Sequence, residues 1–290
     1  MIDRPRRSAL YMPASNPRAI EKARGLPCDA VILDLEDAVA PEAKVEARER
    51  AAACVRDGGF GRRELVVRVN GLDTPWGAQD LAVIAAAGPD AILVPKVNGA
   101  GDIAAYDAAI SQAPASTRLW AMIETCAAVF ELREIARCAR TSRLAAFVMG
   151  LNDLAKDMGG RQTPDRAPHH AVLTLAVAAA RTEGLFILDS VCNDLDDPDG
   201  LAAVCRQGVD FGFDGKSLIH PNQIAICNRL FGPDPSEVVW ARAVIAAFAD
   251  PANAGRGALR VEGRLAERLH LVQAERLVAM AEAIAAAEGG

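Results

Sequence analysis

Charged residues recur where the apolar segments of this chain end. Each apolar segment is typical of a buried strand, and a charged side chain at its end is costly to bury unless a partner neutralises it. Carboxylates in such positions can hold a metal ion or move protons, and a cation can stabilise an oxyanion. The residues concerned are Asp34, Arg68, Lys96, Glu124, Asp153, Asp189 and Asp214.

Glu124 and Asp153 are candidate ligands for a hard divalent cation. The histidines and cysteines of the chain show no spacing typical of a zinc site. Mg²⁺ takes one or two protein carboxylates and completes its coordination shell with water and substrate oxygens. From the residues alone, ordinary ion pairing with Arg68 or Lys96 stays open as the alternative.

Alternation along two expected strands sorts the charges by face. Asp34 and Glu36 share one face of their strand, and Arg68 and Asn70 share one face of the next. If the aliphatic faces pack against helices, the polar faces point into the top of a barrel. Arg68 would then lie among the carboxylates and neutralise part of their charge.

The elements that must position these residues alternate between strand and helix. The charged positions follow one another at roughly thirty residues, about one strand plus one helix with their connections. This spacing predicts an α/β fold, a (β/α)8 TIM barrel over residues 1–231, whose strands end at a single active-site mouth. The first helix is expected to begin with Asn16 as N-cap and Pro17 at its first position. Further helices are predicted near residues 42–54, 75–87, 101–111, 126–139, 167–182, 197–207 and 221–230.

The pattern changes after Phe231, so residues 232–290 are expected to form a C-terminal helical extension. A Gly-Pro-Asp-Pro breaker at residues 232–235 precedes an amphipathic helix over residues 236–249. Residues 250–263 are rich in Gly and Ala and are predicted to be a flexible connection, followed by a last helix over residues 265–287. The extension is interpreted either as an oligomer contact or as a lid over the barrel mouth.

Composition bounds the function. A chain of 290 residues that is 51% hydrophobic can bury one large core. Its net charge of −6 and pI near 5.4 argue against a nucleic-acid partner. No apolar run is long enough to span a membrane, and the seven scattered cysteines are typical of free thiols in a reducing compartment. We therefore expect a cytoplasmic protein that binds neither nucleic acid nor membrane.

Seven segments together indicate a family. They are RSALYMPASNPRAIEKA, DAVILDLEDAVAPEAK, VVRVNGLDTPW, ILVPKV, AMIET, MGLNDLAKDMG and FDGKSLIHPNQI, in this order and over nearly the whole chain. The chain thereby resembles the citrate lyase β-subunit family, which includes malyl-CoA and citramalyl-CoA lyases. The resemblance implies a TIM barrel with a C-terminal helical lid, assembled as a homotrimer or hexamer. It also implies Mg²⁺-dependent cleavage or formation of C–C bonds in 3-hydroxyacyl thioesters, with Mn²⁺ as an alternative metal.

The resemblance also assigns roles at the barrel mouth. Glu124 and Asp153 would be the Mg²⁺ ligands, and Arg68 would contact the thioester carbonyl or the keto acid. Glu36 and Asp37 would lie beside the metal. Mg²⁺ would lower the cost of the substrate alkoxide, and Arg68 would stabilise the enolate.

Two further segments carry implied roles outside the mouth. Asn16, Arg18 and Lys22 lie in the stretch that contacts the CoA phosphates in such lyases; many members have Arg where Asn16 stands, and Arg18 would take that contact. Glu267 stands where malyl-CoA lyase-like relatives usually carry an Asp, in the lid of a neighbouring subunit, that takes part in proton transfer. The alternatives are a capping role for Glu267 and Asp37 as the base.

The favoured interpretation is a carbon–carbon lyase that splits malyl-CoA, citramalyl-CoA or citryl-CoA into acetyl-CoA and a keto acid. One alternative is a thioesterase acting on the same hydroxyacyl-CoA. Another is a citrate lyase β subunit that acts on an acyl-carrier-protein thioester within a complex. Among the remaining polar residues, we expect His220 to shape a turn and Asp189 to pair internally, whereas Lys216 would anchor a loop or a phosphate.

Overall fold

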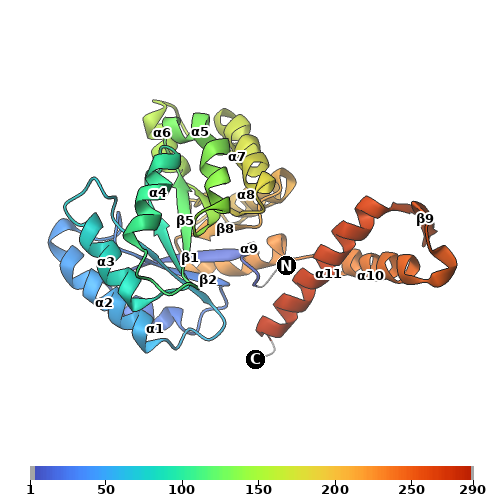
Figure 1. The fold of residues 1–290 in the computed structure, drawn as a ribbon, viewed down its shortest axis with the longest axis horizontal. Helices are drawn as coiled ribbons and strands as arrows, with labels where there is room; N and C mark the ends of the chain where they lie inside the picture. The colour runs from blue at the N-terminus through green and yellow to red at the C-terminus, as the bar shows by residue number, and fades with distance from the viewer. Residues whose placement is uncertain (1–3, 289–290) are drawn as a thin grey trace. The chain divides into compact units, whose positions relative to one another are not determined.

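The barrel is closed. The structure is a computed structural model that describes residues 4–288, and in it eight parallel strands pair in sequence order, with β8 returning to β1. Helices surround the strands (Figure 1). The predicted (β/α)8 fold is confirmed. The strands are β1 Ser8–Pro13, β2 Ala30–Asp34, β3 Glu64–Arg68, β4 Ala91–Val94, β5 Arg118–Ile123, β6 Leu144–Met149, β7 Phe186–Asp189 and β8 Gly215–Leu218.

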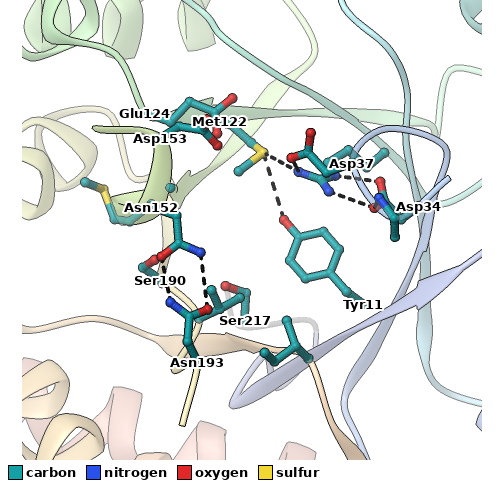
Figure 2. Close-up of a pocket in the computed structure, with 16 residues that line it drawn as sticks. Tyr11, Asp34, Asp37, Met122, Glu124, Asn152, Asp153, Ser190, Asn193 and Ser217 are labelled. Atoms are coloured by element: carbon teal, nitrogen blue, oxygen red, sulfur yellow. Dashed lines mark hydrogen bonds and ion pairs between the residues drawn. The ribbon is translucent and has the colours of Figure 1, made fainter. Parts of the chain in front are cut away.

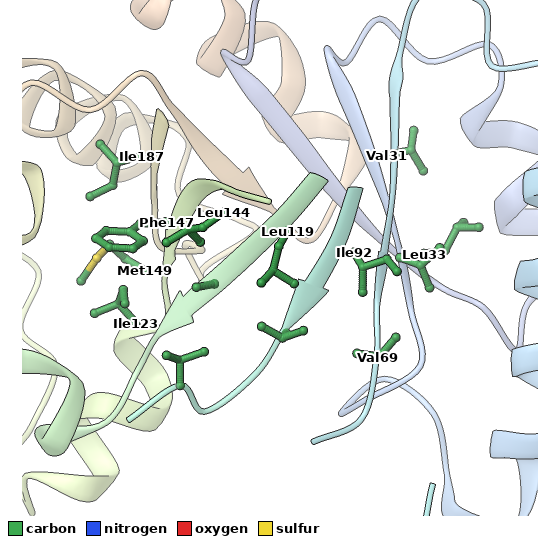
Figure 3. Close-up of a cluster of buried hydrophobic side chains, with 14 of the residues drawn as sticks. Val31, Leu33, Val69, Ile92, Leu119, Ile123, Leu144, Phe147, Met149 and Ile187 are labelled. Carbon is green, nitrogen blue, oxygen red and sulfur yellow. The ribbon is translucent and has the colours of Figure 1, made fainter. Parts of the chain in front are cut away.

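Side-chain alternation along the strands builds two apolar layers. In β2, Ile32 packs inside the barrel, whereas Val31 and Leu33 belong to a larger cluster between the strands and the helices. Figure 3 shows members of this outer cluster, among them Val31, Leu33 and Ile187. Both layers are buried, which is why the strand sequences are almost continuously apolar.

The first barrel helix begins at the cap that the sequence predicts. Asn16 Oδ1 accepts a hydrogen bond of 3.1 Å from the Ala19 N–H, and Pro17 is the first helical residue, as expected. Thr125 and Asp197 cap α5 and α8 in the same way. The helices are α1 Pro17–Ala23, α2 Lys44–Asp57, α3 Gly77–Ala87, α4 Ala100–Ala109, α5 Cys126–Arg137, α6 Leu151–Asp157, α7 His170–Thr182, α8 Pro198–Phe211 and α9 Ile224–Phe231.

Two expected strand ends are wrong. Asp214 precedes β8 instead of ending it, because Phe211 still belongs to α8 and the strand begins only at Gly215. The Asp214 carboxylate pairs with Arg181 at 2.8 Å. Asp153 does not end a strand either: β6 stops at Met149, and Asp153 lies in the first turn of the short helix α6. An apolar run cut by a glycine does not reveal whether strand or helix follows that glycine.

The chain after Phe231 belongs to a second compact unit. It contains α10 Pro235–Ala249, the antiparallel pair β9 Ala258–Val261 and β10 Arg264–Glu267, and α11 Arg268–Glu288. The flexible connection expected over residues 250–263 is therefore wrong in its second half. Glu262 and Gly263 both adopt positive φ at the turn between the two strands. The glycine at position 263 therefore allows a tight hairpin turn.

Membrane-spanning helices and disulfide bonds are both absent among residues 4–288. Between residues 4 and 288, no helix is long and apolar enough to cross a membrane. All seven cysteines are free thiols, as the scattered pattern predicts.

Candidate active site

A cavity of about 300 Å³ opens at the C-terminal ends of the barrel strands. Figure 2 shows Asp34, Asp37 and Tyr11 on one side of it and Asn152, Ser190, Asn193 and Ser217 on the other, with Glu124 and Asp153 next to Asn152. The polar residues around it are Tyr11, Asp34, Asp37, Arg68, Glu124, Asn152, Asp153, Ser190, Asn193 and Ser217. This position matches the mouth at which barrel enzymes carry their active sites.

Arg68 and Asp34 form the centre of the charged side. They are the last residues of β3 and β2 and are opposite each other in the strand register. Arg68 Nε and Nη2 each donate to one Asp34 oxygen at 2.7 Å, and both side chains are buried. Burial is the strongest single influence and would lower the pKa of Arg68, but Asp34, Tyr11 and Glu36 together outweigh burial and hold that pKa well above its ordinary value.

Glu36 and Asp37 approach the remaining nitrogen of the same guanidinium. Glu36 Oε2 lies 2.7 Å from Arg68 Nη1, and Asp37 Oδ2 lies 3.5 Å from it. Glu36 Oε1 also faces Lys96 Nζ at 3.4 Å. Burial raises the pKa of Glu36 despite these cations, whereas the Asp37 side chain is exposed.

A buried lysine holds the loop that carries Glu36. Lys44 Nζ donates to the Leu35 and Glu36 carbonyl oxygens at 2.9 Å each and to Asn70 Oδ1 at 2.8 Å. Three acceptors satisfy the three protons of the ammonium group. Sequence reasoning missed Lys44, because an exposed position on α2 and a buried one are equally compatible with a lysine near the start of a helix.

Glu124 comes directly after β5 and is buried. Its Oε1 accepts a hydrogen bond of 2.7 Å from the backbone N–H of Lys96, a residue with a φ of 49°. That left-handed conformation is rare for lysine and aims the N–H at the carboxylate. Burial, with the nearby Glu36 carboxylate, raises the pKa of Glu124 to about 8.

Gly150 permits Glu124 and Asp153 to approach the same part of the cavity. A Cβ atom at position 150 would lie 2.6 Å from both Glu124 Cβ and Oε2 and 3.1 Å from Met122 Cε. Three residues later, Asp153 is half-buried, lines the cavity and contributes negative charge at Glu124. A glycine is therefore required where β6 gives way to α6.

The donor set fits a hard cation. Within residues 4–288, no three or more His, Cys, Asp or Glu side chains are grouped to hold a metal by themselves. Two carboxylates suffice for Mg²⁺, since this ion retains several waters and substrate oxygens as ligands. The site also needs positive charge, because Arg68, one of the cations that act on Glu124, is already surrounded by Asp34, Glu36 and Asp37.

The opposite wall is neutral. Asn152 and Asn193 exchange two hydrogen bonds, of 3.2 and 2.8 Å, between their side-chain amides. Ser190 Oγ accepts from the Leu151 N–H at 3.0 Å and so ties the start of α6 to β7. Figure 2 shows this wall across from Asp34 and Asp37. None of these residues was predicted from the sequence, since amides and hydroxyls are common in loops.

The structural roles expected for Asp189 and His220 are confirmed, and of the two roles open for Lys216 the structure supports the loop anchor, since its Nζ donates to the Ser190 carbonyl oxygen. Asp189 is fully buried and pairs with Arg166 at 2.7 Å and Lys216 at 3.1 Å. Lys216 is therefore engaged inside the barrel and is not available to a phosphate. His220 Nδ1 accepts from the Asn222 N–H at 3.3 Å, in the capping box that shapes the turn before α9.

The residues expected to bind CoA lie outside the cavity lining. Asn16, Arg18 and Lys22 are exposed at the cap, the start and the last turn of α1, the helix that follows β1. The side-chain oxygen of Asn16 caps the helix by accepting the Ala19 N–H. Glu267 ends β10 in the C-terminal unit, where its backbone N–H donates to His270 Nδ1 at 2.9 Å.

Comparisons with known proteins identify the relatives of this chain. A family model described as HpcH/HpaI aldolase/citrate lyase matches residues 7–221. A (3S)-malyl-CoA thioesterase of Cereibacter sphaeroides is 48% identical over 282 residues, which cover 97% of this chain and 96% of that protein. An L-malyl-CoA/beta-methylmalyl-CoA lyase of the same organism is 35% identical over 309 residues, covering 98% and 96%.

A solved structure extends the comparison to the fold. It is protein CitE from Mycobacterium tuberculosis in complex with magnesium, acetoacetate and coenzyme A, which is 29% identical with a TM-score of 0.76. The match covers 97% of this chain and 98% of CitE. With the family model spanning all eight barrel strands, these likenesses bear out the family resemblance seen in the sequence. The chain belongs to the HpcH/HpaI aldolase/citrate lyase family.

Proposed function

We propose that the protein hydrolyses the thioester of a short 3-hydroxyacyl-CoA such as malyl-CoA. The observation that carries this proposal is the 48% identity to a malyl-CoA thioesterase over nearly the full length of both chains. The match to the lyase extends over 309 residues, more than the 290 of this chain, so the lyase has segments without a counterpart here. Hydrolysis is therefore placed ahead of the C–C cleavage that the sequence favoured.

In this proposal Glu124 and Asp153 hold Mg²⁺, or Mn²⁺ in its place. Two observations support the assignment: both carboxylates line the cavity, and Gly150 leaves the space beside Glu124 free of a Cβ. When bound, the ion would supply Lewis-acid polarisation of a substrate oxygen and offset the negative charge around Glu124.

The chain's own residues would orient the substrate. Arg68 Nη1 would face the substrate and stabilise the negative charge that develops on the thioester oxygen during attack by water. Asn152 and Asn193 offer donors and acceptors to the hydroxyl and carboxylate of the acyl group. The water oxygen bonds to the thioester carbon, the C–S bond breaks, and the departing thiolate takes up a proton.

Three carboxylates are candidates for the base that activates water. Asp37 is exposed at the mouth, 3.5 Å from Arg68, and is suited to exchange protons with solvent. Glu36 is buried and its pKa is raised, so it would act from within the site. Glu267, from the C-terminal unit of a neighbouring subunit in a homotrimer or hexamer, is the third candidate.

Arg18 and Lys22, with Asn16 beside them, are proposed to bind the phosphates of CoA. Their exposure on α1 suits an extended ligand whose nucleotide stays at the surface while the acyl group enters the barrel. The CoA bound in the similar CitE structure supports a site for this ligand on the same fold.

A second candidate function is the lyase reaction on malyl-CoA, citramalyl-CoA or citryl-CoA, giving acetyl-CoA and a keto acid. The 35% identity to a malyl-CoA lyase favours it. Action on a carrier-protein thioester inside a citrate lyase complex is the third. All three begin from a thioester at the same charged mouth.

One experiment separates these functions. The purified protein is incubated with malyl-CoA, citramalyl-CoA and citryl-CoA, each with Mg²⁺ and with EDTA, and the products are identified by mass spectrometry. Free CoA with an intact hydroxy acid is the expected result. Acetyl-CoA with a keto acid would establish the lyase, and no turnover of any CoA ester would point to a carrier-protein substrate.

A further inference from the structure

Two hydrogen-bond donors converge on one weak acceptor inside the cavity. Tyr11 Oη lies 3.9 Å from Met122 Sδ, and Arg68 Nη1 lies 3.7 Å from the same sulfur. Figure 2 shows both contacts meeting at Met122. A thioether sulfur accepts hydrogen bonds only weakly. A substrate oxygen that reached this point would satisfy both donors better than the sulfur does.

The Tyr11 hydroxyl is available to such an oxygen. Among residues 4–288, the Met122 sulfur is its one hydrogen-bond partner. The ring packs against the inner apolar layer and lies 4.9 Å from the Arg68 guanidinium carbon. Tyr11 is paired with Ile32 in the β1–β2 register, so a strand and not a loop fixes the hydroxyl.

Arg68 presents one particular nitrogen to the same point. Its Nε and Nη2 are occupied by the two oxygens of Asp34. Nη1 lies among Glu36, Asp37 and the Met122 sulfur, and Asp37 and Met122 both line the cavity. The Asp34 pair thus fixes the direction in which the Nη1 protons point.

We propose that Tyr11 is a further catalytic residue, whose hydroxyl donates together with Arg68 Nη1 to the thioester carbonyl oxygen of the substrate. The inference rests on the proposed function, since it requires an acyl thioester in this cavity. The two donors come from β1 and β3, and both belong to the rigid barrel. Together they would form an oxyanion hole whose donors are held in place before the substrate binds.

The donor pair serves hydrolysis and C–C cleavage alike. In hydrolysis, water bonds to the carbonyl carbon and the C=O π pair moves onto the oxygen before the C–S bond breaks. In C–C cleavage, the β-hydroxyl loses its proton, the pair of the broken bond forms an enolate, and the negative charge rests on the same oxygen. Tyr11 and Arg68 stabilise that oxygen in both cases.

The kinetic test is Tyr11→Phe, which removes only the hydroxyl. We expect kcat on malyl-CoA to fall roughly 10²–10³-fold, the usual cost of one oxyanion-hole donor, with KM changed far less. Tyr106→Phe is the matched control, because Tyr106 is the other tyrosine of the chain and its hydroxyl contacts Leu72 and Pro95 outside the cavity. An active wild type with an equally active Tyr11→Phe would overturn the inference but not the proposed function.

A binding test needs no turnover. Two inert substrate analogues without the β-hydroxyl are compared with Mg²⁺ present: a ketone in which CH₂ replaces the thioester sulfur, and a thioether in which CH₂ replaces the carbonyl. The wild type should prefer the ketone, and Tyr11→Phe should reduce that preference about tenfold. An unchanged preference would contradict the donor pair. A wild type that binds neither analogue would contradict the proposed function, and the donor pair with it.

Discussion

Arg68 and Asp34 end neighbouring strands and meet in a two-point ion pair, with Nε–Oδ1 and Nη2–Oδ2 distances of 2.7 Å. Both side chains are at least nine-tenths buried. The pair leaves Nη1 as the one nitrogen of Arg68 directed at Glu36, Asp37 and the cavity. The orientation of the cation at the mouth therefore depends on Asp34, a residue to which no chemical role is assigned.

Asp34→Asn should destabilise the protein by about 3–5 kcal/mol, because it leaves a buried guanidinium without its main partner. Urea unfolding followed by circular dichroism measures the change. The control is Glu134→Gln, which breaks the exposed pair with Arg137 on α5 and should cost less than about 1 kcal/mol. Equal effects of the two changes would show that the buried pair does not hold the mouth together.

The stability of the metal-free protein should fall as pH rises between about 4.5 and 8. The pKa of Glu124 is near 4.5 in the unfolded chain and is raised to about 8 in the fold by burial, so the folded state binds the extra proton in this window. Glu124→Gln removes the group. In EDTA, the melting temperature of the variant relative to wild type should therefore increase across the window.

Each unit of pKa difference corresponds to about 1.4 kcal/mol, so this effect is measurable by calorimetry. Addition of Mg²⁺ at pH 8 should stabilise the wild type and not Glu124→Gln. The difference in melting temperature between the two proteins should therefore become smaller. A difference in melting temperature that stays constant from pH 4.5 to 8 would contradict the assigned titration of Glu124.

Gly150→Ala should weaken the metal site while the fold persists. The added Cβ meets Glu124 at 2.6 Å, so the carboxylate must move. We expect a stability loss of about 1–3 kcal/mol and a fall of about 10–100-fold in Mn²⁺ affinity, measured by electron paramagnetic resonance. Gly101→Ala on α4, where a Cβ meets nothing within 4 Å, is the control and should leave affinity unchanged. An unchanged Mn²⁺ affinity in Gly150→Ala would show that Glu124 is not a ligand of the metal.

Arg18→Ala and Lys22→Ala should each raise KM for a CoA thioester about fivefold and leave kcat unchanged, since they remove contacts remote from the reacting bond. A pantetheine thioester, which lacks the nucleotide, should be processed equally by wild type and variants. Arg56→Ala, an exposed position on α2, is the control. If both thioesters respond alike, the α1 residues do not bind the CoA nucleotide.

Residue types and their spacing were enough to predict the barrel and to place Asp34, Arg68, Glu124 and Asp189 at its strand ends or directly after them. Parallel strands buried on both sides are read easily, because each is an unbroken apolar run. Asp214 was misplaced, since the run from Phe211 contains the end of a helix and the start of a strand. The hairpin at residues 258–267 was missed because each of its strands is only four residues long, too short for alternation to stand out.

Much of the mouth depends on contacts that no local pattern encodes. The direction of Arg68 is set by Asp34 across the sheet, and the Glu36 loop is set by Lys44 on α2. Gly150 matters only because Glu124, from another strand, occupies the space of its missing Cβ. Alternation along β1 does place Tyr11 inside the barrel, but its weak contact with Met122 needs the closed barrel to be seen.

The most direct measurement of the central claim is the fate of the solvent oxygen when wild type turns over malyl-CoA with Mg²⁺ in H₂¹⁸O. Hydrolysis predicts one ¹⁸O in the new carboxylate of malate, free CoA in equal amount, and loss of both products in Glu124→Ala and Asp153→Ala. Formation of acetyl-CoA and glyoxylate without any ¹⁸O-labelled malate would contradict the thioesterase and establish the lyase.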